Sequence, residues 1–133
     1  MTAAAHDHVS VRYIVDDVDA AVAFYTRHLG FTASGPSAPG FARLGRAGLV
    51  LLLNAPGAGG AGQELQGARP APGGWNRFQL TVDDVGALAE RLTAEGVRLR
   101  GPVITGKGGR QLVIEDPAGN PVELFEPAAA APR

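Results

Sequence analysis

The chain has 133 residues, of which 45% are hydrophobic and 19% charged, and its formal net charge is −1. This is the composition of an ordinary globular domain, and a nearly neutral chain without basic runs argues against nucleic-acid binding. The absence of cysteine excludes disulfides and thiolate chemistry. No apolar run reaches the roughly 18 residues of a membrane span, and the first residues lack the pattern of a signal peptide. We expect a single cytoplasmic domain over residues 1–133, without a membrane or nucleic-acid partner.

A short pattern, Val-Asp-Asp-Val-x-Ala, occurs twice in the chain, at residues 15–20 and again at residues 82–87. Each copy follows a stretch in which apolar and polar residues alternate, which is typical of a β-strand. Each copy also opens a stretch with helical spacing of apolar residues. Asp17 and Asp84 are therefore expected as helix N-caps, since a carboxylate there accepts backbone N–H bonds. The repetition predicts a module that is built twice.

The expected elements alternate in the same order in both copies. They are a strand over 9–15, a helix that ends at Gly30, strands over 31–35, 40–45 and 48–54, then a strand over 78–82, a helix that ends at Gly96, and strands over 97–100, 109–115 and 121–126. The fold class is therefore α+β, with two tandem βαβββ modules at 8–54 and 75–126. Residues 55–74 are rich in Gly and Pro and are expected to form the linker.

Two glycine patterns imitate nucleotide-binding motifs without their context. Gly57-x-Gly59-x-x-Gly62 follows a strand, but prolines and a further glycine stand where the dinucleotide motif needs a helix. The segment from Gly101 to Lys107 resembles a P-loop but lacks the hydroxyl residue that binds magnesium, and a strand follows it. We expect a Gly-rich linker at the first place, a flexible hairpin turn at the second, and no cofactor.

Two further motifs carry a family resemblance. These are Phe-Tyr-Thr-Arg-His-Leu-Gly-Phe at residues 24–31 and Asp-Pro-Ala-Gly-Asn-Pro-Val-Glu-Leu at residues 116–124. With them the chain resembles, over about residues 8–126, the vicinal oxygen chelate superfamily. That superfamily includes glyoxalase I, extradiol dioxygenases, fosfomycin-resistance enzymes and bleomycin-resistance proteins. The resemblance implies that each module curves into half of a cup around a site.

The resemblance also implies four metal-ligand positions, which fall on Ser10, Leu51 or a neighbour, Arg77 and Glu123. A catalytic divalent ion usually needs about three protein ligands. Only Glu123 is a plausible ligand among the four. His8, two residues before Ser10, faces the same side of its strand but could replace it only if the strand shifted. We therefore expect no metal.

Strand periodicity predicts which side chains line the cup instead. Val9, Val11 and alternate residues after them are expected to pack on the first helix, and Phe78 and Leu80 on the second. The opposite face then carries the expected ligand-binding residues, which are Ser10, Arg12, Phe41, Trp75, Arg77, Gln79, Glu123 and Phe125. Trp75 and Phe125 are expected to stack on a ligand, and the polar residues to fix it. We also expect Arg77 and Glu123 to form a salt bridge, directly or through one water.

The favoured function is metal-independent binding of an aromatic or hydrophobic small molecule, similar to the bleomycin-resistance proteins that sequester antibiotics. One alternative is a metal-dependent enzyme of the glyoxalase, lyase or dioxygenase type. Another is a metal-free isomerase or cyclase that uses Glu123 as its base. Arg12 and Arg77 favour an anionic or phenolate ligand. A homodimer is expected, because family members commonly pair their modules between two chains.

Overall fold

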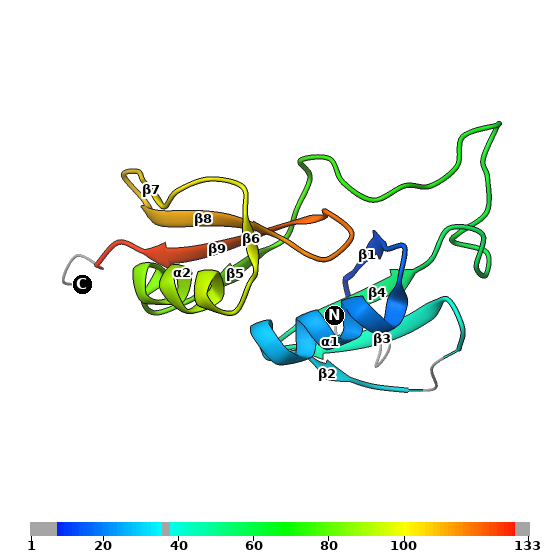
Figure 1. Ribbon diagram of the computed structural model, residues 1–133, viewed down its shortest axis with the longest axis horizontal. Helices are drawn as coiled ribbons and strands as arrows, with labels where there is room; N and C mark the ends of the chain where they lie inside the picture. The colour runs from blue at the N-terminus through cyan, green and yellow to red at the C-terminus, as the bar shows by residue number, and fades with distance from the viewer. Residues whose placement is uncertain (1–7, 36–37, 130–133) are drawn as a thin grey trace, which may run out of the picture. The chain divides into compact units, whose positions relative to one another are not determined.

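The computed structural model describes residues 8–35 and 38–129 (Figure 1). The chain divides into two compact units, Met1–Pro72 and Gly73–Arg133. Each unit contains one helix and one open mixed sheet, of four strands in the first unit and five in the second. The α+β class and the repeated module are thereby confirmed. Neither of the described helices is long and apolar enough to cross a membrane.

The first unit has the order strand, helix and three strands. Its elements are β1 (Ser10–Ile14), α1 (Val18–Leu29), β2 (Thr32–Ala33), β3 (Phe41–Arg46) and β4 (Leu49–Asn54). The strand order in the sheet is β1-β4-β3-β2, in which β1 and β4 are parallel and the other pairs antiparallel. The predicted caps of α1 are present: the Asp17 carboxylate accepts the Ala20 N–H at 3.0 Å, and Gly30 takes the left-handed conformation at φ 70°. In Figure 1, α1 lies against this sheet.

Alternate residues of the first sheet form a core under α1. Tyr13, Leu44, Leu51 and Leu53 are all buried there, as the period of two predicts. The prediction that Val9 also packs on the helix is wrong. Val9 is 77% exposed, because β1 begins only at Ser10 and Val9 lies outside the sheet.

The second unit repeats this order with one strand more. Its elements are β5 (Gln79–Thr81), α2 (Val85–Ala94), β6 (Arg98–Leu99), β7 (Ile104–Thr105), β8 (Gly109–Glu115) and β9 (Pro121–Pro127). The strand order is β5-β9-β8-β6, with β5 and β9 parallel and β7 also paired to β8. Asp84 caps α2 by accepting the Ala87 N–H at 3.0 Å, as predicted.

Strand β7 was not expected from the sequence. Residues 101–107 were interpreted as a flexible turn because they contain two glycines and imitate a phosphate loop. In the structure Ile104 pairs with Gln111 and Thr105 with Arg110, so β7 and β6 follow one another along the same edge of β8. Because only two residues form this strand, its sequence carries too little periodicity to be recognised.

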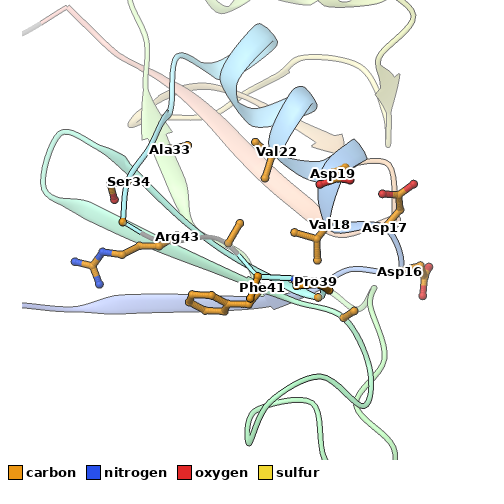
Figure 2. Close-up of a pocket in the computed structure, with 15 residues that line it drawn as sticks. Asp16, Asp17, Val18, Asp19, Val22, Ala33, Ser34, Pro39, Phe41 and Arg43 are labelled. Carbon is orange, nitrogen blue, oxygen red and sulfur yellow. The ribbon is translucent and has the colours of Figure 1, made fainter.

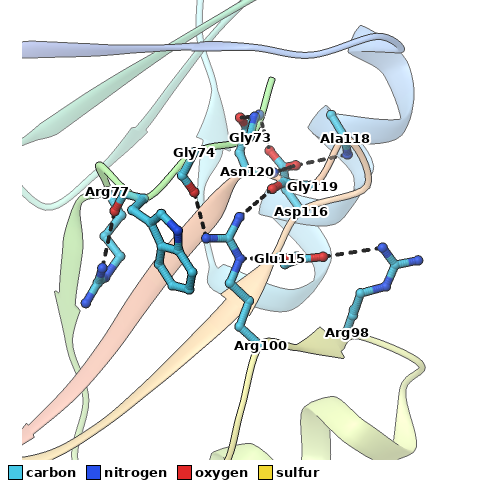
Figure 3. A network of polar contacts seen from close by, with 11 residues as sticks. Gly73, Gly74, Arg77, Arg98, Arg100, Glu115, Asp116, Ala118, Gly119 and Asn120 are labelled. Carbon is cyan, nitrogen blue, oxygen red and sulfur yellow. Dashed lines mark hydrogen bonds and ion pairs between the residues drawn. The ribbon is translucent and has the colours of Figure 1, made fainter. Parts of the chain in front are cut away.

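The Asp-Pro-x-Gly-Asn motif builds the turn between β8 and β9. The Asp116 carboxylate accepts the backbone N–H groups of Ala118 and Asn120, both at 2.9 Å. The Asn120 side chain donates to Asp116 at 3.1 Å and accepts the Gly73 N–H at 2.8 Å (Figure 3). Both side chains are buried. The motif therefore fixes the beginning of the second unit to its turn, which is a structural role.

Candidate ligand-binding faces

The sheet of the first unit has a second face, opposite α1, which we call the first open face. Ladder register arranges it in three rows across β1, β4 and β3. The rows are Ser10–Val50–Gly45, Arg12–Leu52–Arg43 and Ile14–Asn54–Phe41. The predicted residues Ser10, Arg12 and Phe41 thus share one face. Apart from the buried Asn54, these residues are partly or fully exposed.

The buried amide of Asn54 orders one end of this face. Its Oδ1 accepts a hydrogen bond from the Arg12 guanidinium, and its Nδ2 donates to the Ala58 carbonyl at 3.4 Å. Asn54 therefore positions Arg12 and holds the segment after β4. Sequence reasoning missed Asn54, although a polar residue that ends the apolar run Leu51–Leu53 was a visible signal.

A cavity of about 850 Å³ opens at the edge of the first unit (Figure 2). It is lined by the start of α1, by Val22, by the segments on either side of the connection between β2 and β3, and by residues 41–43. Phe41 and Arg43 form the wall on β3. The carboxylates of residues 16, 17 and 19 gather at the start of α1, away from Arg43 in Figure 2. The cavity thus joins the first open face to an acidic rim.

The second unit has a corresponding face opposite α2, which we call the second open face. Register places Gln79, Glu123 and Val113 in one row, and Thr81, Phe125, Gln111 and Ile104 in the next. Phe78 and Leu80, with the opposite parity, are buried as predicted. The predicted residues Arg77, Gln79, Glu123 and Phe125 therefore lie on the expected side of the sheet. Their roles toward a ligand stay predictions.

Arg77, Glu123 and Gln79 form a continuous hydrogen-bonded group on this face. Both Nη2 and Nε of Arg77 contact Oε1 of Glu123, at 2.9 and 3.0 Å. Gln79 donates from Nε2 to Oε2 of Glu123 at 2.6 Å. The predicted salt bridge is thus present and direct. The guanidinium engages one oxygen rather than both, because Gln79 occupies the other.

Trp75 lies on the same unit with its indole exposed. The residue is 69% exposed, and the Arg100 guanidinium stacks on the ring at 4.5 Å from the centroid. A small hollow of about 150 Å³ lies beside it, with Pro102, Ile104 and Val113 in its lining. The sequence predicted an aromatic platform at Trp75, and the structure adds a cation that holds the ring in one orientation.

Arg100 is the residue of this face that sequence reasoning missed. It donates to the Gly74 carbonyl at 2.6 Å, to the Gly119 carbonyl at 2.9 Å and to Glu115 Oε2 at 2.8 Å (Figure 3). Hydrogen bonds from Arg100 first, and then from Arg98, hold the pKa of Glu115 below its ordinary value. Nothing in the sequence distinguishes Arg100 from the solvated arginines, because all of its partners are distant along the chain.

The residues at the family's metal-ligand positions do not fit a metal. Register identifies the first-module position as Leu52, because Leu52 pairs with Arg12 as Glu123 pairs with Gln79, whereas Leu51 is buried under α1. The four positions then offer a hydroxyl, a hydrocarbon, a guanidinium and one carboxylate. The guanidinium of Arg77 already stands against that carboxylate. No three side chains of the His, Cys, Asp or Glu types come together within residues 8–35 and 38–129 as a metal site would need.

Each of the two βαβββ units has a helix on one face of its sheet and an open second face. The chain is therefore a tandem repeat of one βαβββ module. The model of the Glyoxalase/Bleomycin resistance protein/Dioxygenase superfamily matches residues 6–124. The chain belongs to this superfamily, which confirms the resemblance seen in the sequence. A comparison with curated protein sequences gives no significant match.

Solved structures share the fold over nearly their whole length. A lactoylglutathione lyase from Agrobacterium tumefaciens is 25% identical with a TM-score of 0.71, covering 91% of this chain and 93% of its own. TnmS3, an antibiotic binding protein from Streptomyces sp. CB03234, is 26% identical with a TM-score of 0.70, covering 95% and 100%. A superfamily member from Sphaerobacter thermophilus is 28% identical with a TM-score of 0.73, covering 92% and 98%. These relatives include both an enzyme and a binding protein.

Proposed function

We propose that the protein is a metal-independent binding protein that sequesters an aromatic or hydrophobic small molecule. The observation that carries this proposal is Trp75, a residue that is 69% exposed and whose indole the Arg100 guanidinium contacts beside a hollow. An exposed aromatic ring that is held in one orientation loses little conformational entropy when a planar ligand stacks on it. Stacking on Trp75 is the central contact of the proposed complex.

The polar groups of the second open face support the same function. Arg77, Gln79 and Glu123 form one ordered group, and Phe125 occupies the row next to it on the same face. Small-molecule sites usually combine apolar surface with a few fixed polar groups, and the apolar part here is the hollow beside Trp75. The likeness to an antibiotic binding protein is in keeping with this proposal.

The enzymatic alternatives receive less support from this geometry. Arg77 stands where a chelating relative would place a ligand, which disfavours a metal-dependent lyase or dioxygenase. Both oxygens of Glu123 already accept hydrogen bonds, which disfavours its use as a base in a metal-free isomerase.

The proposal is tested by fluorescence titration with phenylnaphthylamine, a neutral aromatic dye. Trp75 is the only tryptophan, so its emission reports directly on this site. We expect saturable quenching of Trp75 together with a rise in dye emission, and a loss of affinity of about tenfold in Trp75→Ala, followed through the dye.

The matched control removes another exposed hydrophobic side chain. Leu65 is 73% exposed in the segment after β4, so Leu65→Ala should bind the dye as the wild type does. EDTA should also leave binding unchanged. Absence of saturable binding, or an equal loss in both variants, would refute the proposal, and loss of binding in EDTA would favour the metal-dependent alternative.

A further inference from the structure

The charges of the two open faces are not balanced in the same way. On the second face the guanidinium of Arg77 is neutralised by Glu123. On the first face Arg12 and Arg43 lie in one row on either side of Leu52, and that row carries no carboxylate. Among the described residues neither arginine forms an ion pair, and the contact of Arg12 is to the neutral amide of Asn54.

From this arrangement we infer that the first open face is a binding site of its own, which takes an amphiphilic aromatic anion and holds its carboxylate, sulfonate or phenolate through Arg12 and Arg43. The inference goes beyond the proposed function, which concerns Trp75 and the second open face. Neighbouring strands lie about 4.8 Å apart, so the Cα atoms of these two arginines are separated by about 10 Å. Two side chains of this length can both reach an anion placed over Leu52.

The surroundings of the row suit the apolar part of such a ligand. Leu52, Ile14 and Phe41 lie on the same face and are partly exposed. A guanidinium donates charge-assisted hydrogen bonds to an anion, while its apolar neighbours can contact the apolar part of the same molecule. The row therefore favours an amphiphilic aromatic anion over a fully hydrated inorganic ion.

The acidic rim of the neighbouring cavity does not reverse this preference. The carboxylates of Asp16, Asp17 and Asp19 lie at the start of α1, and Asp17 already caps the helix through Ala20. None of the three forms an ion pair with Arg43 within the described part of the chain. The acidic rim therefore does not neutralise the guanidinium of Arg43.

The test compares two dyes of similar shape, of which one is anionic and the other neutral. Anilinonaphthalene sulfonate carries an anionic group that the neutral phenylnaphthylamine lacks. We expect wild-type protein to prefer the sulfonate, and Arg43→Gln to weaken sulfonate binding about tenfold while leaving the neutral dye unchanged. Arg43 is the cleaner variant, since its guanidinium makes no hydrogen bond to another described residue. Arg12→Gln should also weaken sulfonate binding, and Arg12→Lys should retain part of the preference for the sulfonate over the neutral dye.

The control is Arg27→Gln, which removes the same charge from the exposed surface of α1. Equal affinity for both dyes, or an equal loss in Arg27→Gln, would overturn the inference while leaving the proposed function standing. Sulfonate binding that falls as the protein concentration rises would show a second copy on this face, and would overturn it as well. Failure of both dyes to bind wild-type protein would refute the proposed function and the inference together.

Discussion

Arg77 and Glu123 show how a single residue changes what a shared position can do. The side chains are 25% and 12% exposed, so the pair is neither fully solvated nor fully buried. In such a setting the attraction between the charges exceeds that of an exposed pair, and an unpaired carboxylate is costly. The pair therefore contributes both to stability and to the shape of the second open face.

We predict that Arg77→Ala lowers the free energy of unfolding by about 1–3 kcal/mol, because Glu123 would keep only Gln79 as a partner. Urea titration at neutral pH measures the change. The control is Arg91→Ala, which breaks the exposed pair of Arg91 with Glu95 at 3.3 Å and should cost about 0.3–0.5 kcal/mol. Equal effects of the two substitutions would show that the Arg77 pair is solvated in solution.

At the scale of elements, Glu115 links β8 to the chain that follows α2. It accepts hydrogen bonds from Arg100 and Arg98, at 2.8 and 3.3 Å, and Arg100 in turn holds the turn before β9. The pKa of Glu126, on β9, is lowered like that of Glu115, by hydrogen bonds from Arg110 and from the Val85 N–H at the start of α2. Ionised carboxylates therefore hold several elements of the second unit together.

The lowered pKa of Glu115 predicts acid sensitivity with a definite sign. The ordinary value is 4.5 and the folded value lies below it, so folding favours the ionised form. The stabilisation is complete above about pH 4.5 and is lost as the pH falls through the folded pKa. Glu115→Gln should be less stable than wild type near neutral pH, and its stability should fall less on acidification. Urea unfolding at about pH 7 and about pH 3 measures both, and parallel curves for the two proteins would contradict the prediction.

Most of the helices and strands could be predicted because the same sequence pattern occurs once in each unit. Asp17 and Asp84 cap the helices as expected, and β8 has the predicted bounds. Local signals were enough for these features, since caps and alternation act within a few residues. Strand β7 and the role of Arg100 were not predictable, because both depend on partners that the fold brings from elsewhere in the chain.

At the scale of the whole molecule, the edges and exposed hydrophobic groups lead us to propose a homodimer. β1 and β2 are the edge strands of the first sheet, and β5 is an edge strand of the second. Strand edges that stay uncovered promote pairing with another chain. Val9, directly before β1, is 77% exposed. A closed two-fold dimer is the commonest assembly that covers such features.

Light scattering at micromolar concentration should therefore give a particle of twice the chain mass of 13.6 kDa. Val9→Glu should shift the population toward the monomer, because a carboxylate beside the edge of β1 would be desolvated by any chain that packs there. Leu65→Glu, at an equally exposed position outside both sheets, should leave the mass unchanged. Both variants should dissociate into monomers on dilution, but Val9→Glu should do so at a higher protein concentration than Leu65→Glu. A mass of 13.6 kDa for the wild type at every concentration would refute the homodimer.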